Sequence, residues 1–162
     1  MALVFIGLGS NLGDGRQNLQ QAWQSLGKTK GITLLSLSSP YKTEPVGIRT
    51  DNWFTNAVGA LETTLTPHEL LATMLDLERA MGRDRSAGHD RSVDLDILYY
   101  DDQIIQDKDL EVPHPRISSR LFVLAPLAEI APDHIHPGLD LSSRHMMRSL
   151  QSTDQVEKTR WR

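Results

Sequence analysis

The chain has 162 residues, of which 39% are hydrophobic and 23% charged, as expected for one globular domain over residues 1–162 with a buried core. It contains no cysteine, which excludes disulfides, thiolate metal ligands and cysteine nucleophiles, so a bound metal would need oxygen or histidine ligands. The net charge of −4 argues against a nucleic-acid partner, and the absence of a long apolar run or a basic leader predicts a cytoplasmic protein without a membrane partner.

The N-terminal third alternates strand and helix signals. Leu3–Leu8 is an apolar run that ends in Gly9, Ser10 and Asn11, which is typical of a buried strand followed by a turn. The next segment carries apolar residues at helical spacing and predicts a helix that ends near Gly27. The apolar stripe of this helix is Leu19, Ala22, Trp23 and Leu26, and its expected N-cap is Asp14.

Two strands and a second helix are predicted next. Ile32–Thr43 and Trp53–Leu65 have strand composition, with a loop containing proline and glycine between them. Thr66 and Glu69 form a capping box around Pro67 at the first helical position, which predicts the start of a helix. A polar loop then leads into a fourth strand over residues 93–100.

The resulting order, β-α-β-β-α-β, predicts an α+β fold with a ferredoxin-like core, in which an antiparallel sheet carries both helices on one face. C-terminal additions are expected beyond this core. They comprise a short hairpin over residues 101–112, helical pieces over 120–130 broken by Pro126 and Pro132, and a final helix over 142–150.

Two carboxylates interrupt the fourth strand. Because side chains at i and i+2 share one side of a strand, Asp94 and Asp96 should project together, while Val93, Leu95, Ile97 and Tyr99 face the core. Two carboxylates this close repel one another unless a cation lies between them, and Mg²⁺ favours such oxygen ligands. The pair therefore indicates either a magnesium site or an ordinary solvated strand face.

A cluster of arginines precedes this strand. Arg79, Arg83, Arg85 and Arg91 fall within thirteen residues of an acidic protein. Guanidinium groups bind phosphate oxygens in pairs and remain charged at any working pH, so acids and arginines together predict a phosphoryl-transfer site. Surface salt bridges among these residues and Asp84 or Asp90 are the alternative.

An aromatic residue and an amide occupy one side of the third strand. Phe54 and Asn56 lie at i and i+2, and together offer a flat apolar face and a side chain that both donates and accepts hydrogen bonds. The pair suits a flat heterocycle, or it serves as ordinary core and a strand-end amide.

The chain resembles the 6-hydroxymethyl-7,8-dihydropterin pyrophosphokinase family from about residue 4 to 132. The matching motifs are GSNLGD, SSPYKTEPVG, FTNAVGALET, ELLATMLDLERAMGR, DRSVDLDILYYDD, VPHPR and RLFVLAPLAEIAP. The resemblance implies a monomeric enzyme of folate biosynthesis that transfers the β,γ-diphosphate of ATP to the hydroxymethyl group of a small-molecule pterin.

The resemblance also implies roles for individual residues. Asp94 and Asp96 correspond to the ligands of two Mg²⁺ ions, and Arg83 and Arg91 to the arginines around the transferred group. ATP-site positions are Glu78, Arg85, Ile97, His114 and Arg120. Pterin-site positions are Thr43, Val46, Phe54, Asn56 and Phe122.

Two segments depart from the family pattern. The loop before Asp94 commonly carries Trp-Gly-Pro-Arg, whereas here residues 88–91 read Gly-His-Asp-Arg, and Glu44 stands where a proline is common.

Two other functions use some of the same residues. A metal-dependent phosphohydrolase would use the acids and arginines without an aromatic pocket, and a ferredoxin-like ligand- or RNA-binding module would display aromatic residues on its sheet.

Overall fold

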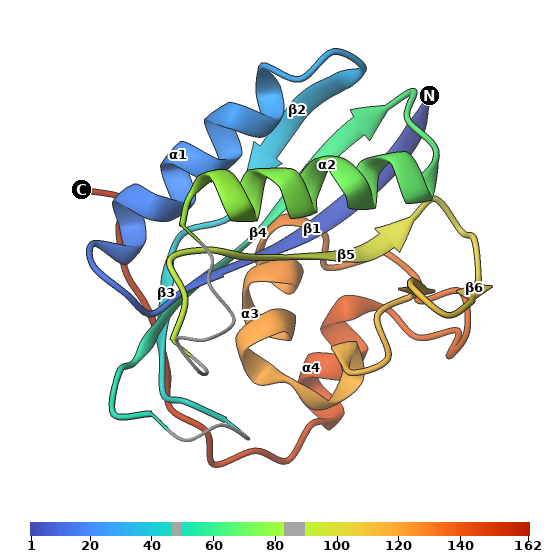
Figure 1. The fold of residues 1–162 in the computed structure, drawn as a ribbon. Coiled ribbons are helices and arrows are strands. Elements are labelled where there is room, and N and C mark those ends of the chain that lie inside the picture. The colour runs from blue at the N-terminus through green and yellow to red at the C-terminus, as the bar shows by residue number, and fades with distance from the viewer. Residues whose placement is uncertain (47–49, 83–89) are drawn as a thin grey trace.

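A computed structural model describes residues 1–46, 50–82 and 90–162. β1 (Ala2–Ser10) lies inside a six-stranded sheet and pairs antiparallel with β4 (Phe54–Thr63) on one side and β5 (Asp94–Tyr100) on the other (Figure 1). β2 (Ile32–Leu37) and β3 (Tyr41–Thr43) both pair with β4. This arrangement confirms the predicted ferredoxin-like core.

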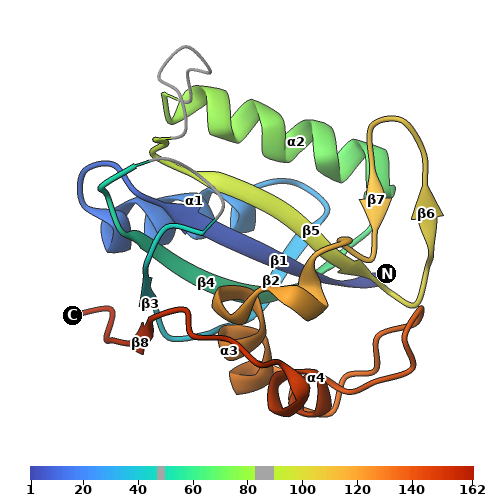
Figure 2. The same cartoon turned by 90° about the horizontal axis from the view of Figure 1, so that it is seen from below.

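The sheet separates two helical layers, as Figure 2 shows. α1 (Gly15–Gly27) and α2 (Pro67–Ala80) cover one face. α3 (Leu121–Ile130) and α4 (Ser143–Ser149) cover the other. The first layer confirms the predicted helix pair, and the second shows that the C-terminal additions build a separate apolar core.

The helix-start signals operate as predicted. Thr66 Oγ1 accepts a hydrogen bond from Glu69 N at 3.2 Å, and Glu69 Oε1 accepts one from Thr66 N at 2.9 Å. Asp14 accepts from Gln17 N at the start of α1. Both caps satisfy amide groups that have no partner within the helix itself.

The predicted strand over residues 32–43 is split. Residues 38–40 separate β2 from β3, and Ser38 Oγ and Ser38 N both bond to Val58 of β4. Pro40 lacks an amide hydrogen and cannot continue a ladder, which explains the interruption. In contrast, Pro126 lies inside α3 without ending it, so the prediction of a break there was wrong.

The remaining elements lie at the edges of the fold. β6 (Ile105–Gln106) and β7 (Glu111–Val112) form the predicted hairpin, and a 3-10 turn, η2 (Ile117–Ser119), precedes α3. β8 (Val156–Lys158) pairs with β3 and was not predicted. Within the part of the chain that the structure describes, no helix is long and apolar enough to cross a membrane.

The prediction for Tyr99 was wrong. The β1–β5 register shifts between Phe5 and Ile6, which pair with Tyr99 and Ile97 respectively, leaving Leu98 as an extra residue. Leu98 and Tyr99 consequently both pack in the core under α3 and α4, whereas Ile97 packs under α1 and α2. A bulge of this kind reverses the alternation of the side chains beyond it.

Candidate active site

A pocket opens between the sheet and the start of α3, on the face away from α1 and α2. Its empty volume is about 700 Å³, a figure that includes the space open to solvent at its mouth. Nine residues singled out in the sequence line it: Thr43, Val46, Phe54, Asn56, Arg91, Asp94, Asp96, Arg120 and Phe122. The fold therefore joins residues of four separate segments in one site.

The acidic pair lies at one side of this pocket. Asp94 and Asp96 pair with Gly9 and Gly7 of β1, and both carboxylates face the pocket as the strand alternation predicted. Burial raises the pKa of Asp96 to about 7, and the neighbouring Asp94 carboxylate adds to the increase, while the Arg120 guanidinium opposes it. A cation between the two acids would offset this repulsion.

Arginines surround the acids. Arg91 Nη1 lies 3.3 Å from Asp94 Oδ2, and the Arg91 guanidinium lies 5.9 Å from the centre of the Phe54 ring. The Arg120 guanidinium lies 5.4 Å from the centre of the Phe122 ring. The site thus has a cationic side suited to phosphate next to an aromatic side. Arg83 and Arg85 lie outside the described residues.

The end of β1 holds Arg91 in place. Asn11 Oδ1 accepts from Arg91 N at 2.7 Å, and Asn11 N donates to Arg91 O at 3.1 Å. Asn11 Nδ2 also donates to Asp90 Oδ1 at 2.8 Å. These contacts explain the asparagine of the GSN sequence, for which the sequence alone predicted only a turn.

Glu78 supports the acidic strand from α2. Its buried side chain accepts a hydrogen bond from Leu95 N at 2.7 Å. β5 is the last strand of the sheet, so this amide points to the edge and has no neighbouring strand as partner. Glu78 therefore fixes the backbone between the two aspartates.

The opposite side of the pocket carries the aromatic and amide groups. Asn56 Nδ2 donates to Thr43 Oγ1 at 2.7 Å, and both side chains are buried. This hydrogen bond orients the Asn56 amide, so the protein and not the solvent determines the direction of its oxygen. Phe54 comes from the sheet and Phe122 from the first turn of α3, so the two rings belong to different layers.

Eight further lining residues were not assigned to the site from the sequence: Gly7, Leu8, Gly9, Glu44, Ala57, Val58, Leu98 and Val123. Gly9 leaves room for the amide, because a Cβ there would lie 2.8 Å from Asn56 Oδ1. The glycines occupy alternate positions of β1, which was the available signal for a strand face that lies against a site.

Besides Glu78, two other predicted ATP-site residues, Ile97 and His114, lie outside the pocket. The Ile97 side chain packs in the core under α1 and α2, so only its backbone, at the same sheet edge as Leu95, could contact a ligand. His114 lines a neighbouring hollow with Glu111 and Pro115. Burial, with help from Arg120 and Arg116, lowers the pKa of His114 to about 4, and its Nδ1 accepts from Arg116 N at 3.2 Å.

The acids fit magnesium better than a metal held by protein ligands alone. No group of three or more histidine and acidic side chains in the described ranges could hold a metal ion. Mg²⁺ commonly takes one or two protein carboxylates and completes its shell with water and substrate phosphates. Asp94 and Asp96 supply that number of carboxylates.

Comparisons with known proteins agree with this chemistry. The family profile described as 7,8-dihydro-6-hydroxymethylpterin-pyrophosphokinase matches residues 5–132. A Methylorubrum extorquens protein named 2-amino-4-hydroxy-6-hydroxymethyldihydropteridine pyrophosphokinase is 42% identical over 139 residues, covering 85% of this chain and 88% of its own. A Bacillus subtilis protein of the same name is 43% identical over 129 residues, covering 79% and 77%.

The fold is shared with solved structures. The HPPK-DHPS protein of Plasmodium falciparum, solved as the wild type with STZ-DHP, superposes with a TM-score of 0.75 at 14% identity. The match covers 91% of this chain and 43% of the Plasmodium chain, so this chain spans less than half of that protein.

Proposed function

The chain belongs to the 7,8-dihydro-6-hydroxymethylpterin-pyrophosphokinase family, and we propose that the pocket between β5, β4 and α3 is its active site. The enzyme transfers the β,γ-diphosphate of ATP to the hydroxymethyl group of 6-hydroxymethyl-7,8-dihydropterin, a step of folate biosynthesis. The pterin hydroxyl oxygen forms a bond to the β-phosphorus and loses its proton to the solvent, the bond from that phosphorus to the α,β-bridging oxygen breaks, and AMP leaves.

The aromatic side of the pocket takes the pterin in this proposal. Phe54 and Phe122 offer apolar faces to a flat ring system, and Asn56 presents an oriented amide to its hydrogen-bonding edge. Thr43 fixes that amide, and Val46 closes the apolar wall. The single observation that carries this assignment is the convergence of these residues with Asp94 and Asp96 in one pocket.

The charged side takes the nucleotide. Asp94 and Asp96 would hold two Mg²⁺ ions, which when bound neutralise phosphate charge and orient the diphosphate. Arg91 and Arg120 bind phosphate oxygens, and Glu78 holds the strand that carries the acids. The same phosphate-binding role is proposed for Arg83 and Arg85 from the family resemblance alone, because they lie outside the described residues. His114 and the Ile97 backbone contact the nucleotide from the adjoining hollow and sheet edge.

These residues act mainly by positioning and by balancing charge. Phosphoryl transfer has little covalent chemistry for the protein to perform, and guanidinium groups gain most where negative charge develops. A phosphohydrolase would need the acids and arginines but neither the oriented amide nor the two aromatic rings. We further propose that the protein is a monomer, which sedimentation analysis at working concentration tests directly.

The test is incubation with ATP, Mg²⁺ and the reduced hydroxymethylpterin, followed by identification of the nucleotide product. Pterin-dependent AMP is expected. Asp94→Ala and Asp96→Ala should each abolish turnover while the protein remains folded, and Asp102→Ala on the exposed turn after β5 is the matched control. Release of ADP, or of phosphate without pterin, would overturn the assignment of this site.

A further inference from the structure

The C-terminal segment lies beside the pterin side of the pocket although the family match ends at residue 132. β8 pairs antiparallel with β3, so that Val156 lies opposite Thr43, and Thr43 lies opposite Phe54 of β4. Two residues of the pocket therefore belong to a ladder whose outer strand is β8. Without β8, the three-residue strand β3 would be the edge of the sheet.

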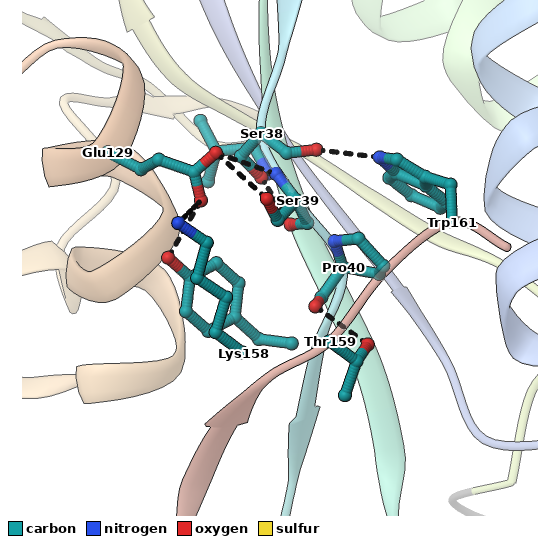
Figure 3. Close-up of polar contacts among 9 residues, drawn as sticks. Ser38, Ser39, Pro40, Glu129, Lys158, Thr159 and Trp161 are labelled. Atoms are coloured by element: carbon teal, nitrogen blue, oxygen red, sulfur yellow. Dashed lines mark hydrogen bonds and ion pairs between the residues drawn. The ribbon is translucent and has the colours of Figure 1, made fainter.

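Residues after β8 also form hydrogen bonds to the segment that precedes β3 (Figure 3). Thr159 N and Thr159 Oγ1 donate to Pro40 O at 2.8 and 2.9 Å. Trp161 Nε1 donates to Ser38 O at 3.0 Å, and its ring packs against the core under α1. The segment is thus attached along the whole stretch that leads into β3.

A carboxylate from α3 contacts β3, the residues just before it and β8, as Figure 3 shows. Glu129 Oε2 accepts from Ser39 N at 2.9 Å and from Ser39 Oγ at 3.1 Å. Glu129 Oε1 accepts from Tyr41 OH at 2.8 Å and lies 3.7 Å from Lys158 Nζ. The helix that contributes Phe122 is thereby connected to β3 and β8 through one side chain.

The residue before β8, Gln155, is hydrogen-bonded to a residue that lines the pocket, Glu44. Glu44 N donates to Gln155 O at 3.1 Å, and Gln155 N donates to Glu44 Oε1 at 2.7 Å. Glu44 follows β3 directly and lines the pocket with Thr43 and Val46. The carboxylate of a pocket residue is therefore turned toward the C-terminal backbone by a charge-assisted hydrogen bond.

We propose that residues 155–158 act as a positioning strap for the pterin side of the site, and that Glu44 is a positioning residue that acts through Gln155. The strap holds Thr43, which orients the Asn56 amide, and it fixes the backbone at Glu44, from which Val46 reaches the pocket wall. This inference rests on the proposed function of the pocket. It assigns a role in pterin affinity to a segment beyond the matched residues.

The decisive variant is Gln155→Pro, which removes the amide donor to Glu44. Gln155→Ala is the matched control, because the Gln155 side chain is exposed and the alanine keeps both backbone groups. Pterin affinity measured by equilibrium titration should fall about tenfold in the proline variant, as for loss of one hydrogen bond to a charged group, and stay unchanged in the alanine control. The KM for ATP should stay the same in both.

Substitutions at Glu44 test whether the residue acts through the strap. Glu44→Ala should weaken pterin binding about as much as Gln155→Pro, and the double variant should be no weaker than either alone, because both remove the same interaction. Glu44→Gln keeps an acceptor oxygen and should lie between the wild type and Glu44→Ala. Additive losses in the double variant would mean that Glu44 contacts the ligand directly and would overturn the strap.

A second measurement does not require the proline variant to fold. Because coupling between two sites is reciprocal, pterin at saturation should slow hydrogen exchange at the Gln155 amide, whereas ATP with Mg²⁺ alone should not. Unchanged exchange with bound pterin would refute the inference. A wild type that binds no pterin would instead refute the proposed function of the pocket.

Discussion

Replacing Asp96 by asparagine should stabilise the protein in the absence of metal. Burial raises the pKa of Asp96 from an ordinary value of 3.8 to about 7, and the neighbouring Asp94 carboxylate adds to the increase. The folded protein therefore holds this proton more tightly than the unfolded chain does, and ionisation of Asp96 lowers the free energy of unfolding. Asparagine has nearly the same shape but cannot ionise.

The size of the effect follows from the pKa. Each pKa unit corresponds to about 1.4 kcal/mol, so ionised Asp96 costs about 4 kcal/mol near neutral pH. This loss of stability is absent below the pKa that Asp96 has in the unfolded chain and grows as the pH rises. It becomes constant above the pKa that Asp96 has in the folded protein. The free energy of unfolding of the variant should exceed that of the wild type by about 2 kcal/mol at about pH 5 and by about 4 kcal/mol at about pH 7.5.

The assay is denaturant unfolding with a metal chelator present, at both pH values. Asp102→Asn on the exposed turn serves as the control and should track the wild type. Adding Mg²⁺ with a non-hydrolysable ATP analogue should narrow the difference by stabilising only the wild type. A variant no more stable than the wild type at about pH 7.5, or a difference that does not change with pH, would refute the reasoning.

Two other substitutions probe the support of the pocket. Gly9→Ala places a Cβ 2.8 Å from Asn56 Oδ1, so the amide must turn away from Thr43. Overpacking of about 1–3 kcal/mol should lower pterin affinity by about 5- to 150-fold in an equilibrium titration, with ATP binding retained. Unchanged pterin affinity would contradict the role of the amide. Glu129→Ala leaves Tyr41 OH and Ser39 N without their acceptor and should cost about 2–3 kcal/mol in urea unfolding, with Glu129→Gln losing less. Equal losses in the two Glu129 variants would contradict the hydrogen-bond explanation.

Local signals in the sequence were sufficient for most of the fold. The capping box at Thr66 and Glu69 predicted the start of α2, because the two residues that make it are three positions apart. Strand alternation placed Asp94 and Asp96 together on one face for the same reason. The candidate site was predicted wherever residues of recognisable chemistry lie in such short patterns.

Other features depend on partners far away in the chain. The bulge at Leu98 arises from pairing with β1 and turns Tyr99 to the unexpected face. Glu78 meets Leu95 N only because α2 packs across the edge of β5. Asn11 meets Arg91 because β1 and β5 are antiparallel neighbours, which brings the residue after β1 beside the residues before β5. The residue pattern within a single segment does not predict these contacts, because each contact joins two segments that are far apart in the chain.

The sequence by itself determined most of the elements and the shared face of the two aspartates, because helix caps and strand alternation are properties of neighbouring residues. Site positions such as Thr43, Arg120 and Phe122 followed only from the resemblance to the family. The tertiary structure alone decided which groups hold those residues in place. Glu44 and Gln155 are 111 residues apart, and β8 is a strand through its pairing with β3. A three-residue strand has too few local contacts to be recognised before its partner is known.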